Sequence, residues 1–155
     1  MIREERPGDR AAVREVEIAA FGREVEADIV DALRSDPAWA LSLVAELDDE
    51  VVGHLLFSRG SHGVMTLGPL AVLPSHQRRG IGTALMHGGL ARITGPVVLL
   101  GHPAYYTRFG FRPALPLGVT NQWGIEGPEW MIRGAASAGE VRFPEPFADA
   151  APPTD

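Results

Sequence analysis

An apolar stretch, Leu70–Leu73, runs into a loop with two arginines and two glycines, Arg78-Arg79-Gly80-Ile81-Gly82, and the loop runs into a helical pattern. Where a strand turns into a helix through such a loop, several backbone N–H groups are left without partners at the positive end of the helix dipole. Glycines at this place remove the side chains that would block a close approach to the backbone. The stretch therefore predicts an anion site, and a phosphate or pyrophosphate is the anion that such loops commonly hold.

Composition narrows what the chain can do. It has 155 residues, no cysteine and a formal net charge of -6, which excludes disulfides and thiol nucleophiles and argues against nucleic acid as a partner. All 14 of its basic residues are arginines, so it has no lysine for a P-loop or a Schiff base. No apolar run reaches the roughly 20 residues of a membrane span, and the first residues have no signal-peptide core. We expect a cytoplasmic chain without a membrane partner.

The order of the predicted elements indicates an α/β fold, a mixed central sheet flanked by helices in a single domain. Apolar alternation and β-rich runs predict strands at residues 1–6, 41–47, 51–57, 65–73, 97–100, 129–133 and 140–143. Helical spacing predicts helices that follow residues 9 and 22 and helices over 80–93 and 103–109. The domain is expected to span residues 1–143, and the Pro/Ala-rich tail 144–155 is expected to fray.

Local signals add detail to this outline. Asp9 is a predicted N-cap of the first helix, and Asp48-Asp49-Glu50 predicts a hairpin turn. Gly68-Pro69 falls inside the strand over 65–73, where proline cannot donate a ladder hydrogen bond, so the strand is expected to bulge or splay there. Gly88-Gly89 in the middle of a helix predicts either close packing against a sheet or a bent helix end.

Two familiar phosphate sites do not fit the loop. A nucleotide P-loop needs a lysine after its last glycine, and the chain has none. A dinucleotide fold needs Gly-x-Gly-x-x-Gly near its first strand, whereas here Gly80-Ile81-Gly82 is followed by Thr83-Ala84-Leu85 in the middle of the chain.

The stretch from Leu70 to Leu85 instead resembles the acetyl-CoA motif of the GNAT superfamily of N-acetyltransferases, a strand, then Gln/Arg-x-x-Gly-x-Gly/Ala, then a helix. Downstream, Tyr105-Tyr106-Thr107-Arg108-Phe109-Gly110-Phe111 is similar to the second signature of that family, a short helix that ends in Tyr-x-x-aromatic/aliphatic-Gly-Phe. The two signatures occur in the expected order, and the specific resemblance covers residues 68–113.

The resemblance implies transfer of an acetyl group from acetyl-CoA, the acyl-donor cosubstrate, to a primary amine of a small molecule or peptide. The amine would attack the thioester directly in a ternary complex, without a metal. The pantetheine arm would pair with the strand at Leu70–Val72, and the pyrophosphate would bind the N–H groups of Arg78–Thr83. The residues expected to bind the cofactor are Leu70, Ala71, Val72, Gln77, Arg78, Arg79, Gly80, Ile81, Gly82 and Thr83.

Acetyl transfer needs an oxyanion donor, a proton for the leaving thiolate and a neutral amine. By resemblance, the N–H of Val72 is the oxyanion donor and Tyr106 is the catalytic acid, since a phenol with a pKa near 10 stays protonated at neutral pH. Alternatively, Tyr106 only packs in a cluster of aromatic residues. The base stays open because the strand before the motif carries no carboxylate; Glu24, Glu26, His54 and His62 are the candidates, each of which is also an ordinary surface residue type.

Other questions also stay open. Acceptor recognition is expected from the first two helices and residues 120–124, with Trp123 and Trp130 lining a pocket or packing in the core. His102 either takes the place of a polar family residue or closes a loop. A non-catalytic acyl-CoA sensor or interaction module is the alternative function, and a longer acyl donor is a third. A homodimer fits the family, but the sequence does not decide it.

Overall fold

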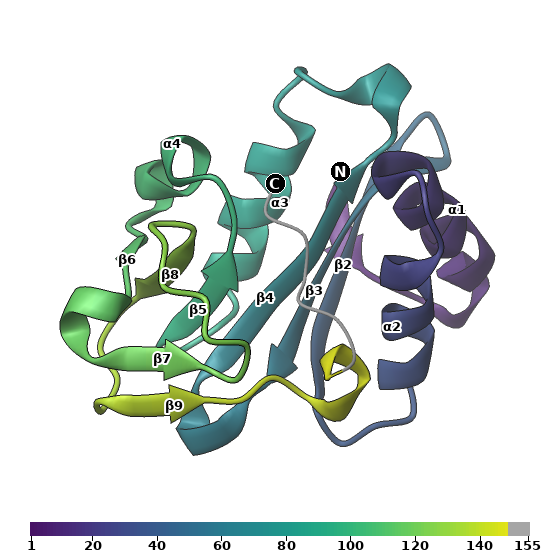
Figure 1. Cartoon of the computed structure of the whole chain (residues 1–155). Helices are drawn as coiled ribbons and strands as arrows, with labels where there is room; N and C mark the ends of the chain where they lie inside the picture. The colour runs from purple at the N-terminus through teal and green to yellow at the C-terminus, as the bar shows by residue number, and fades with distance from the viewer. Residues whose placement is uncertain (149–155) are drawn as a thin grey trace. The chain divides into compact units, whose positions relative to one another are not determined.

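Seven strands form a mixed sheet in the hydrogen-bonded order β1-β2-β3-β4-β5-β8-β6, and β7 and β9 form a second, two-stranded sheet (Figure 1). The computed structural model describes residues 1–148. The strands are β1 Ile2–Glu4, β2 Trp39–Leu47, β3 Glu50–Arg59, β4 Met65–Val72, β5 Val97–Leu100, β6 Arg112–Pro113, β7 Val119–Asn121, β8 Trp130–Arg133 and β9 Gly139–Val141. The helices are α1 Arg10–Phe21, α2 Val25–Leu33, α3 Ile81–Leu90 and α4 Pro103–Tyr106. The predicted α/β class is confirmed.

By their internal contacts the residues group into two compact units. Unit 1 consists of residues 1–57 and 68–93, and unit 2 consists of residues 58–67 together with the chain from residue 94 onward. The strands β3 and β4 each contribute residues to both units. Each unit is described by itself below.

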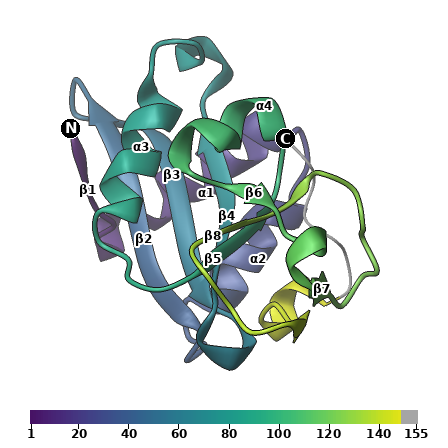
Figure 2. The same ribbon diagram turned by 90° about the vertical axis from the view of Figure 1, so that its left-hand side faces the viewer.

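In unit 1, helices cover both faces of the strands. Figures 1 and 2 show α3 against one face of β1, β2 and β3, and α1 and α2 against the opposite face. β1 pairs antiparallel with β2, with Arg3 opposite Val44. Asp48 and Asp49 between β2 and β3 have φ values of 51° and 61°. Two successive positive φ values are typical of a two-residue hairpin turn, which confirms the predicted hairpin.

The glycine pair of α3 packs where the sequence predicts close contact. A Cβ atom on Gly89 would lie 2.4 Å from Cε1 of Phe57, a fully buried residue of β3. A Cβ atom on the neighbouring Gly88 would meet Cγ2 of Ile2 at 3.0 Å. The missing side chain at Gly89 therefore lets the helix approach the sheet.

We expect Gly89→Ala to lower the free energy of unfolding by about 1–2 kcal/mol, because the strain of overpacking against Phe57 exceeds the roughly 1 kcal/mol that alanine adds to helix propensity. Urea unfolding measures the change. Gly88→Ala, the matched control, should cost less than Gly89→Ala. A more stable Gly89→Ala chain would contradict the packing argument.

Asp9 does not cap α1 as predicted. Its side chain makes no capping hydrogen bond to that helix. Instead its carboxylate accepts hydrogen bonds from the Arg6 N–H at 2.7 Å and from the Arg3 guanidinium at 2.7 and 3.0 Å. The carboxylate thus stabilises the short 3-10 turn Pro7–Asp9 that precedes α1, a role that depends on the neighbouring strand.

The hydrogen bond from Arg3 lowers the pKa of Asp9, and the Arg6 N–H lowers it further, while burial opposes both. Since the folded pKa lies below the unfolded value of about 4, this contribution to stability is present above about pH 4 and is lost as the pH falls through the folded pKa. Between pH 5 and pH 3 we expect the free energy of unfolding to fall less in Asp9→Asn than in the unaltered chain. The two decreases should differ by less than about 1 kcal/mol. Urea titrations at both pH values measure this; Asp49→Asn, in an exposed turn, should leave the slope unchanged.

In unit 2, β5 is the central strand and all four of its residues are buried. Its parallel ladder with β4 consists of two pairs among the described residues, Met65 with Val97 and Thr66 with Val98. On its other side β5 pairs antiparallel with β8 along its whole length, from Val97 with Arg133 to Leu100 with Trp130. The ladder between β4 and β5 thus stops before Gly68-Pro69, as the proline predicts.

The C-terminal part of unit 2 was only partly predicted. β9 confirms the late strand, while β6 and β7, with two and three residues, are too short for a periodic signal. Glu145–Phe147 forms a 3-10 turn, and Phe147 is buried against Phe143 with ring centroids 5.5 Å apart. The predicted tail therefore begins with an ordered turn; its residues 149–155 lie outside the described residues.

Candidate functional site

The loop between β4 and α3 presents its backbone to solvent. α3 begins at Ile81, and its N-cap, Gly80, adopts a left-handed conformation with φ 81°. Arg78 has a φ of 64°, an uncommon conformation for a non-glycine residue that is frequent at ligand sites. No side-chain hydrogen bond caps this helix end, and residues 77–80 are exposed. This end of α3 can therefore accept an anion, as the sequence predicts.

Gln77 ties the loop to the end of β4. Its side-chain Nε2 donates a hydrogen bond to the Val72 carbonyl oxygen at 3.0 Å. Predicted as a cofactor residue, Gln77 therefore also has a structural contact that holds the loop. Along β4, Leu70 and Val72 are half-buried and Ala71 is buried, so alternate residues leave one side of the strand accessible.

A cavity of about 400 Å³ opens beside the loop, within unit 1. This volume lies in the range of small-molecule sites, about 300–1,000 Å³. Three predicted cofactor residues border it. The lining residues are Arg79, Gly80, Ile81 and Ala84 of the loop and α3, with Met1, Ile2, Ala45, Glu46, Leu47 and Val52 of the adjacent strands.

In unit 2, Tyr106 lies at the end of α4 and is 6% exposed. Its ring packs edge-on against Tyr105 and Phe111, with centroids 5.0 and 6.1 Å apart. A Cβ atom on Gly101 would lie 2.2 Å from Cε2 of Tyr106, so the ring fills the space over this glycine. The predicted catalytic acid is thus also a member of the aromatic cluster, which fixes its position just beyond β5.

The short helix that carries Tyr106 forms as predicted. The His102 carbonyl oxygen accepts the N–H groups of Tyr105 and Tyr106, both at 3.1 Å. Gly110 ends the following 3-10 turn with a φ of 88°. His102 itself is exposed at the helix N-cap, so it closes the loop between β5 and α4.

His54, one of the candidate bases, is fully buried in unit 1. Its Nδ1 atom lies 2.6 Å from Oε2 of Glu17, and its Nε2 atom lies 2.8 Å from Oγ of Ser42. The Ser42 hydroxyl donates to Oε1 of Glu5 at 2.6 Å, and the other oxygen of Glu5 pairs with Arg34. We call these five residues the buried polar chain.

The hydrogen bonds of the buried polar chain determine where its protons lie. The single Ser42 proton points to Glu5, so Oγ of Ser42 must accept a proton from Nε2 of His54. Between Nδ1 of His54 and Glu17 there is then one more proton, carried by either partner. Both ring nitrogens are therefore engaged inside the protein, and His54 does not serve as a base for a ligand.

The two glutamates at the start of α2 differ in exposure. The Glu26 side chain is 2% exposed and accepts a hydrogen bond from Nε of Arg23 at 2.9 Å. The Glu24 side chain is 71% exposed and lies 3.5 Å from Nη2 of Arg14. Each carboxylate is thus already engaged by an arginine of unit 1.

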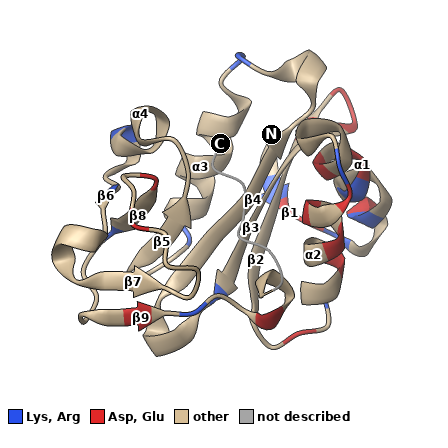
Figure 3. Ribbon diagram, in the orientation of Figure 1, with Lys and Arg blue, Asp and Glu red and all other residues tan. Residues whose placement is uncertain are grey.

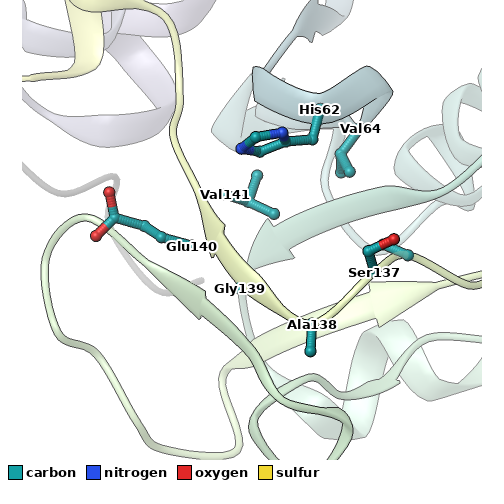
Figure 4. A pocket seen from close by; sticks show the side chains of 8 residues that line it. His62, Val64, Ser137, Ala138, Gly139, Glu140 and Val141 are labelled. Atoms are coloured by element: carbon teal, nitrogen blue, oxygen red, sulfur yellow. The ribbon is translucent and has the colours of Figure 1, made fainter.

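His62 lines a separate small cavity in unit 2, of about 140 Å³ (Figure 4). In Figure 4 its ring lies over Val141, while the carboxylate of Glu140 points away from the ring; that carboxylate pairs with Arg142 at 2.8 Å. His62 precedes β4, whose first residue pairs with the first residue of β5. In this parallel pair it lies at the edge opposite to Gly101, so it is not near Tyr106.

Of the two candidate pocket tryptophans, Trp130 is a core residue with 0% exposure, and its Nε1 donates to the Val119 carbonyl at 2.8 Å. Trp123 is half-buried and packs on Phe143, with centroids 4.9 Å apart. The side-chain oxygen of Asn121 accepts the Trp123 N–H at 3.0 Å. The segment 120–124 thus consists of the end of β7 and the turn that follows it. No group of three or more histidines and carboxylates able to hold a metal occurs among residues 1–148.

Glu129 is a residue of interest that the sequence analysis missed. It lies directly before β8, and its carbonyl oxygen accepts the N–H of Gly101 at 3.0 Å. Its Oε1 atom is buried without a hydrogen-bond partner in the described part of the chain. No local pattern marks it, because its position depends on the pairing of β5 with β8.

Comparisons with known proteins identify the family. The model of the acetyltransferase (GNAT) domain matches residues 38–113. Over 163 aligned positions the chain is 32% identical to the uncharacterized N-acetyltransferase YhbS of Escherichia coli, covering 95% of this chain and 98% of YhbS. It is also 42% identical to the uncharacterized N-acetyltransferase YjhQ of Escherichia coli over 118 residues, which cover 68% of this chain and 65% of the length of YjhQ.

Solved structures agree. The crystal structure of YhbS in complex with CoA superposes with a TM-score of 0.89 at 29% identity, covering 96% of this chain and 91% of that one. A GNAT acetyltransferase from Brucella melitensis in complex with acetyl-CoA superposes with a TM-score of 0.81 at 36% identity, covering 95% and 97%. The mixed sheet with its flanking helices and the exposed loop before α3 thus define a protein of the acyltransferase class. The chain belongs to the GNAT family of acetyltransferases.

No helix in residues 1–148 has the length and apolar character needed to span a bilayer.

Proposed function

We propose that this chain is an N-acetyltransferase that moves an acetyl group from acetyl-CoA to a primary amine. The observation that carries the proposal is the uncapped N-terminus of α3, where Arg78 and Gly80 adopt left-handed conformations in an exposed loop. The relatives of known structure, which hold CoA and acetyl-CoA, support the same cosubstrate. The proposal includes a cytoplasmic location.

The loop supplies what a pyrophosphate needs. The first N–H groups of a helix have no partners within the helix and lie at the positive end of its dipole, and Arg78 and Arg79 add two positive charges. The half-buried Leu70 and Val72 mark the side of β4 along which the pantetheine arm would lie. Leu70–Val72 and Gln77–Thr83 remain the proposed cofactor residues.

Once the amine is neutral, transfer of the acetyl group needs a donor for the oxyanion and a proton for the leaving thiolate. The amine nitrogen bonds to the thioester carbon, and the oxygen becomes an oxyanion that the Val72 N–H would stabilise. As the carbon–sulfur bond breaks, Tyr106 would give its phenolic proton to the leaving thiolate. The position of the Tyr106 ring, fixed by Gly101, Tyr105 and Phe111, favours this role because a proton donor must be held in place.

The charge of the chain favours a cationic acceptor. Acidic residues, red in Figure 3, occur along both α1 and α2 of unit 1. Arg14 on α1 is shared among three of these carboxylates, those of Glu24, Asp28 and Asp31. A surplus of negative charge raises the rate of encounter with an ammonium ion, the form in which an alkylamine reaches the enzyme.

A thiol-release assay tests the proposal. The chain is incubated with acetyl-CoA and a panel of primary alkylamines and peptides, and free CoA is measured with a thiol reagent. Amine-dependent release, with the acetylated product seen by mass spectrometry, supports the enzyme. If the chain binds CoA tightly but releases no thiol with any amine, the result would favour the alternative function, a non-catalytic acyl-CoA sensor. The observation that points to this alternative is the absence of a carboxylate from β4.

A further inference from the structure

One oxygen of the Glu129 carboxylate lacks the partner that a buried acceptor requires. Its Oε1 atom is buried, and no group in residues 1–148 donates a hydrogen bond to it. A buried acceptor without a donor costs about 1–3 kcal/mol, and more when it is charged. Such an atom in a native fold requires an explanation, and a bound ligand that donates hydrogen bonds is one.

The backbone of unit 2 holds Glu129 firmly. The next residue, Trp130, is fully buried and donates its N–H to the Gly127 carbonyl at 3.1 Å. The carboxylate folds over Gly127, where a Cβ atom would lie 1.8 Å from Oε1. Only a glycine leaves room for the side chain in this position. The unpartnered oxygen therefore lies against the backbone of the turn that precedes β8.

Gly101 contacts both the backbone of Glu129 and the ring of the proposed catalytic acid, Tyr106. The N–H of Gly101 bonds to the Glu129 carbonyl oxygen at 3.0 Å, and the ring of Tyr106 fills the space where a Gly101 side chain would be. All three residues belong to unit 2 and lie at the C-terminal end of β5. The backbone of Glu129 and the ring of Tyr106 thus have Gly101 as a common neighbour.

We infer that Glu129 is the general base of the reaction: its carboxylate binds the ammonium group of the acceptor and removes one proton from it. The inference rests on the proposed function. An ammonium ion supplies the hydrogen-bond donors and the positive charge that Oε1 lacks. The other candidate bases are less suitable, because His54 and Glu26 are buried and already bonded and His62 lies at the opposite edge of the β4–β5 pair.

The protons balance. The ammonium gives one proton to Glu129, and the neutral amine forms the carbon–nitrogen bond while the carbon–sulfur bond breaks. The thiolate takes the proton of Tyr106, and the resulting phenolate takes the second proton from the nitrogen as the amide forms. Glu129 then releases its proton to water, so the products are the acetamide, free CoA and one proton.

A thiol-release assay from pH 6 to pH 10 tests this role. It compares the unaltered chain with Glu129→Gln and Glu126→Gln, using primary alkylamines at saturating acetyl-CoA. Glu129→Gln should lower kcat/KM about 100-fold or more at pH 7, and the deficit should shrink as the pH approaches the pKa of the amine. CoA affinity should not change. Glu126, exposed in the same segment, is the matched control, and its variant should behave like the unaltered chain.

The acceptor 2,2,2-trifluoroethylamine, whose trifluoromethyl group keeps the amine largely neutral at pH 7, separates catalysis from structure. With this acceptor the Glu129→Gln deficit should nearly vanish. Should the Gln variant fail to fold, Glu129→Ala with added formate replaces it, and formate should restore part of the activity. Full activity of Glu129→Gln, or a deficit equal at every pH and for every amine, overturns the inference. If the unaltered chain releases no thiol with any amine, the proposed function fails as well.

Discussion

Gly82→Glu is expected to weaken CoA binding by at least about 100-fold, which corresponds to about 2.7 kcal/mol. The new carboxylate would stand in the first turn of α3, where the proposed pyrophosphate binds, and would repel it. A negative charge at this helix end stabilises the helix itself by about 0.3–1 kcal/mol. Binding and stability should therefore change in opposite directions, a combination that general misfolding does not produce.

Isothermal titration with CoA measures the affinity, and thermal unfolding measures the stability. Ala91→Glu is the matched control, since it adds the same charge at an exposed position just after the other end of α3. Its CoA affinity should stay within about threefold of the unaltered chain. If Gly82→Glu binds CoA as tightly as the control does, the loop is not the pyrophosphate site.

Tyr106→Phe is expected to lower kcat about 100-fold or more, the range that a general acid contributes, while CoA affinity stays the same. The substitution removes the hydroxyl that would protonate the thiolate but keeps the ring that packs against Tyr105, Phe111 and Gly101. Steady-state thiol release and CoA titration measure the two quantities.

Tyr105→Phe is the control for this experiment. Tyr105 is half-buried, lies next to Tyr106 in the same helix, and stacks with the Arg108 guanidinium 4.8 Å from its ring centroid. Removing its hydroxyl should change kcat less than twofold. Equal kcat values in Tyr106→Phe and the unaltered chain would leave Tyr106 only a packing role.

The parts of the fold that depend on local signals could be predicted from the sequence. β5 matches the apolar run Val97–Leu100, and the loop before α3 follows from Gly80, whose left-handed conformation favours glycine. The end of the ladder between β4 and β5 follows from Pro69, which has no N–H to donate. In each case one residue, or a run of a few, determines the local geometry.

The parts that depend on distant pairing could not be predicted. Glu129 reaches Gly101 only because Leu100 pairs with Trp130, and no single-sequence pattern gives that register. Histidine is a residue type that is common on protein surfaces. The burial of His54 depends on Glu17 and Ser42, which come from two other elements. Asp9 caps a turn instead of a helix because Arg3 on β1 binds it.

The buried polar chain also limits how this chain can evolve or be redesigned. Its members come from α1, β2, β3, the segment after β1 and the residue after α2. Losing Glu5 or Arg34 would leave a charge without its counterpart at a cost of about 3–5 kcal/mol. Losing Glu17, Ser42 or His54 would leave a buried polar group without a hydrogen-bond partner at a cost of about 1–3 kcal/mol. Single substitutions at these positions should therefore be rejected, whereas a concerted exchange of the whole set for apolar residues of similar volume should be tolerated. A library that varies Glu5, Glu17, Arg34, Ser42 and His54 together will find folded chains that a position-by-position scan will miss.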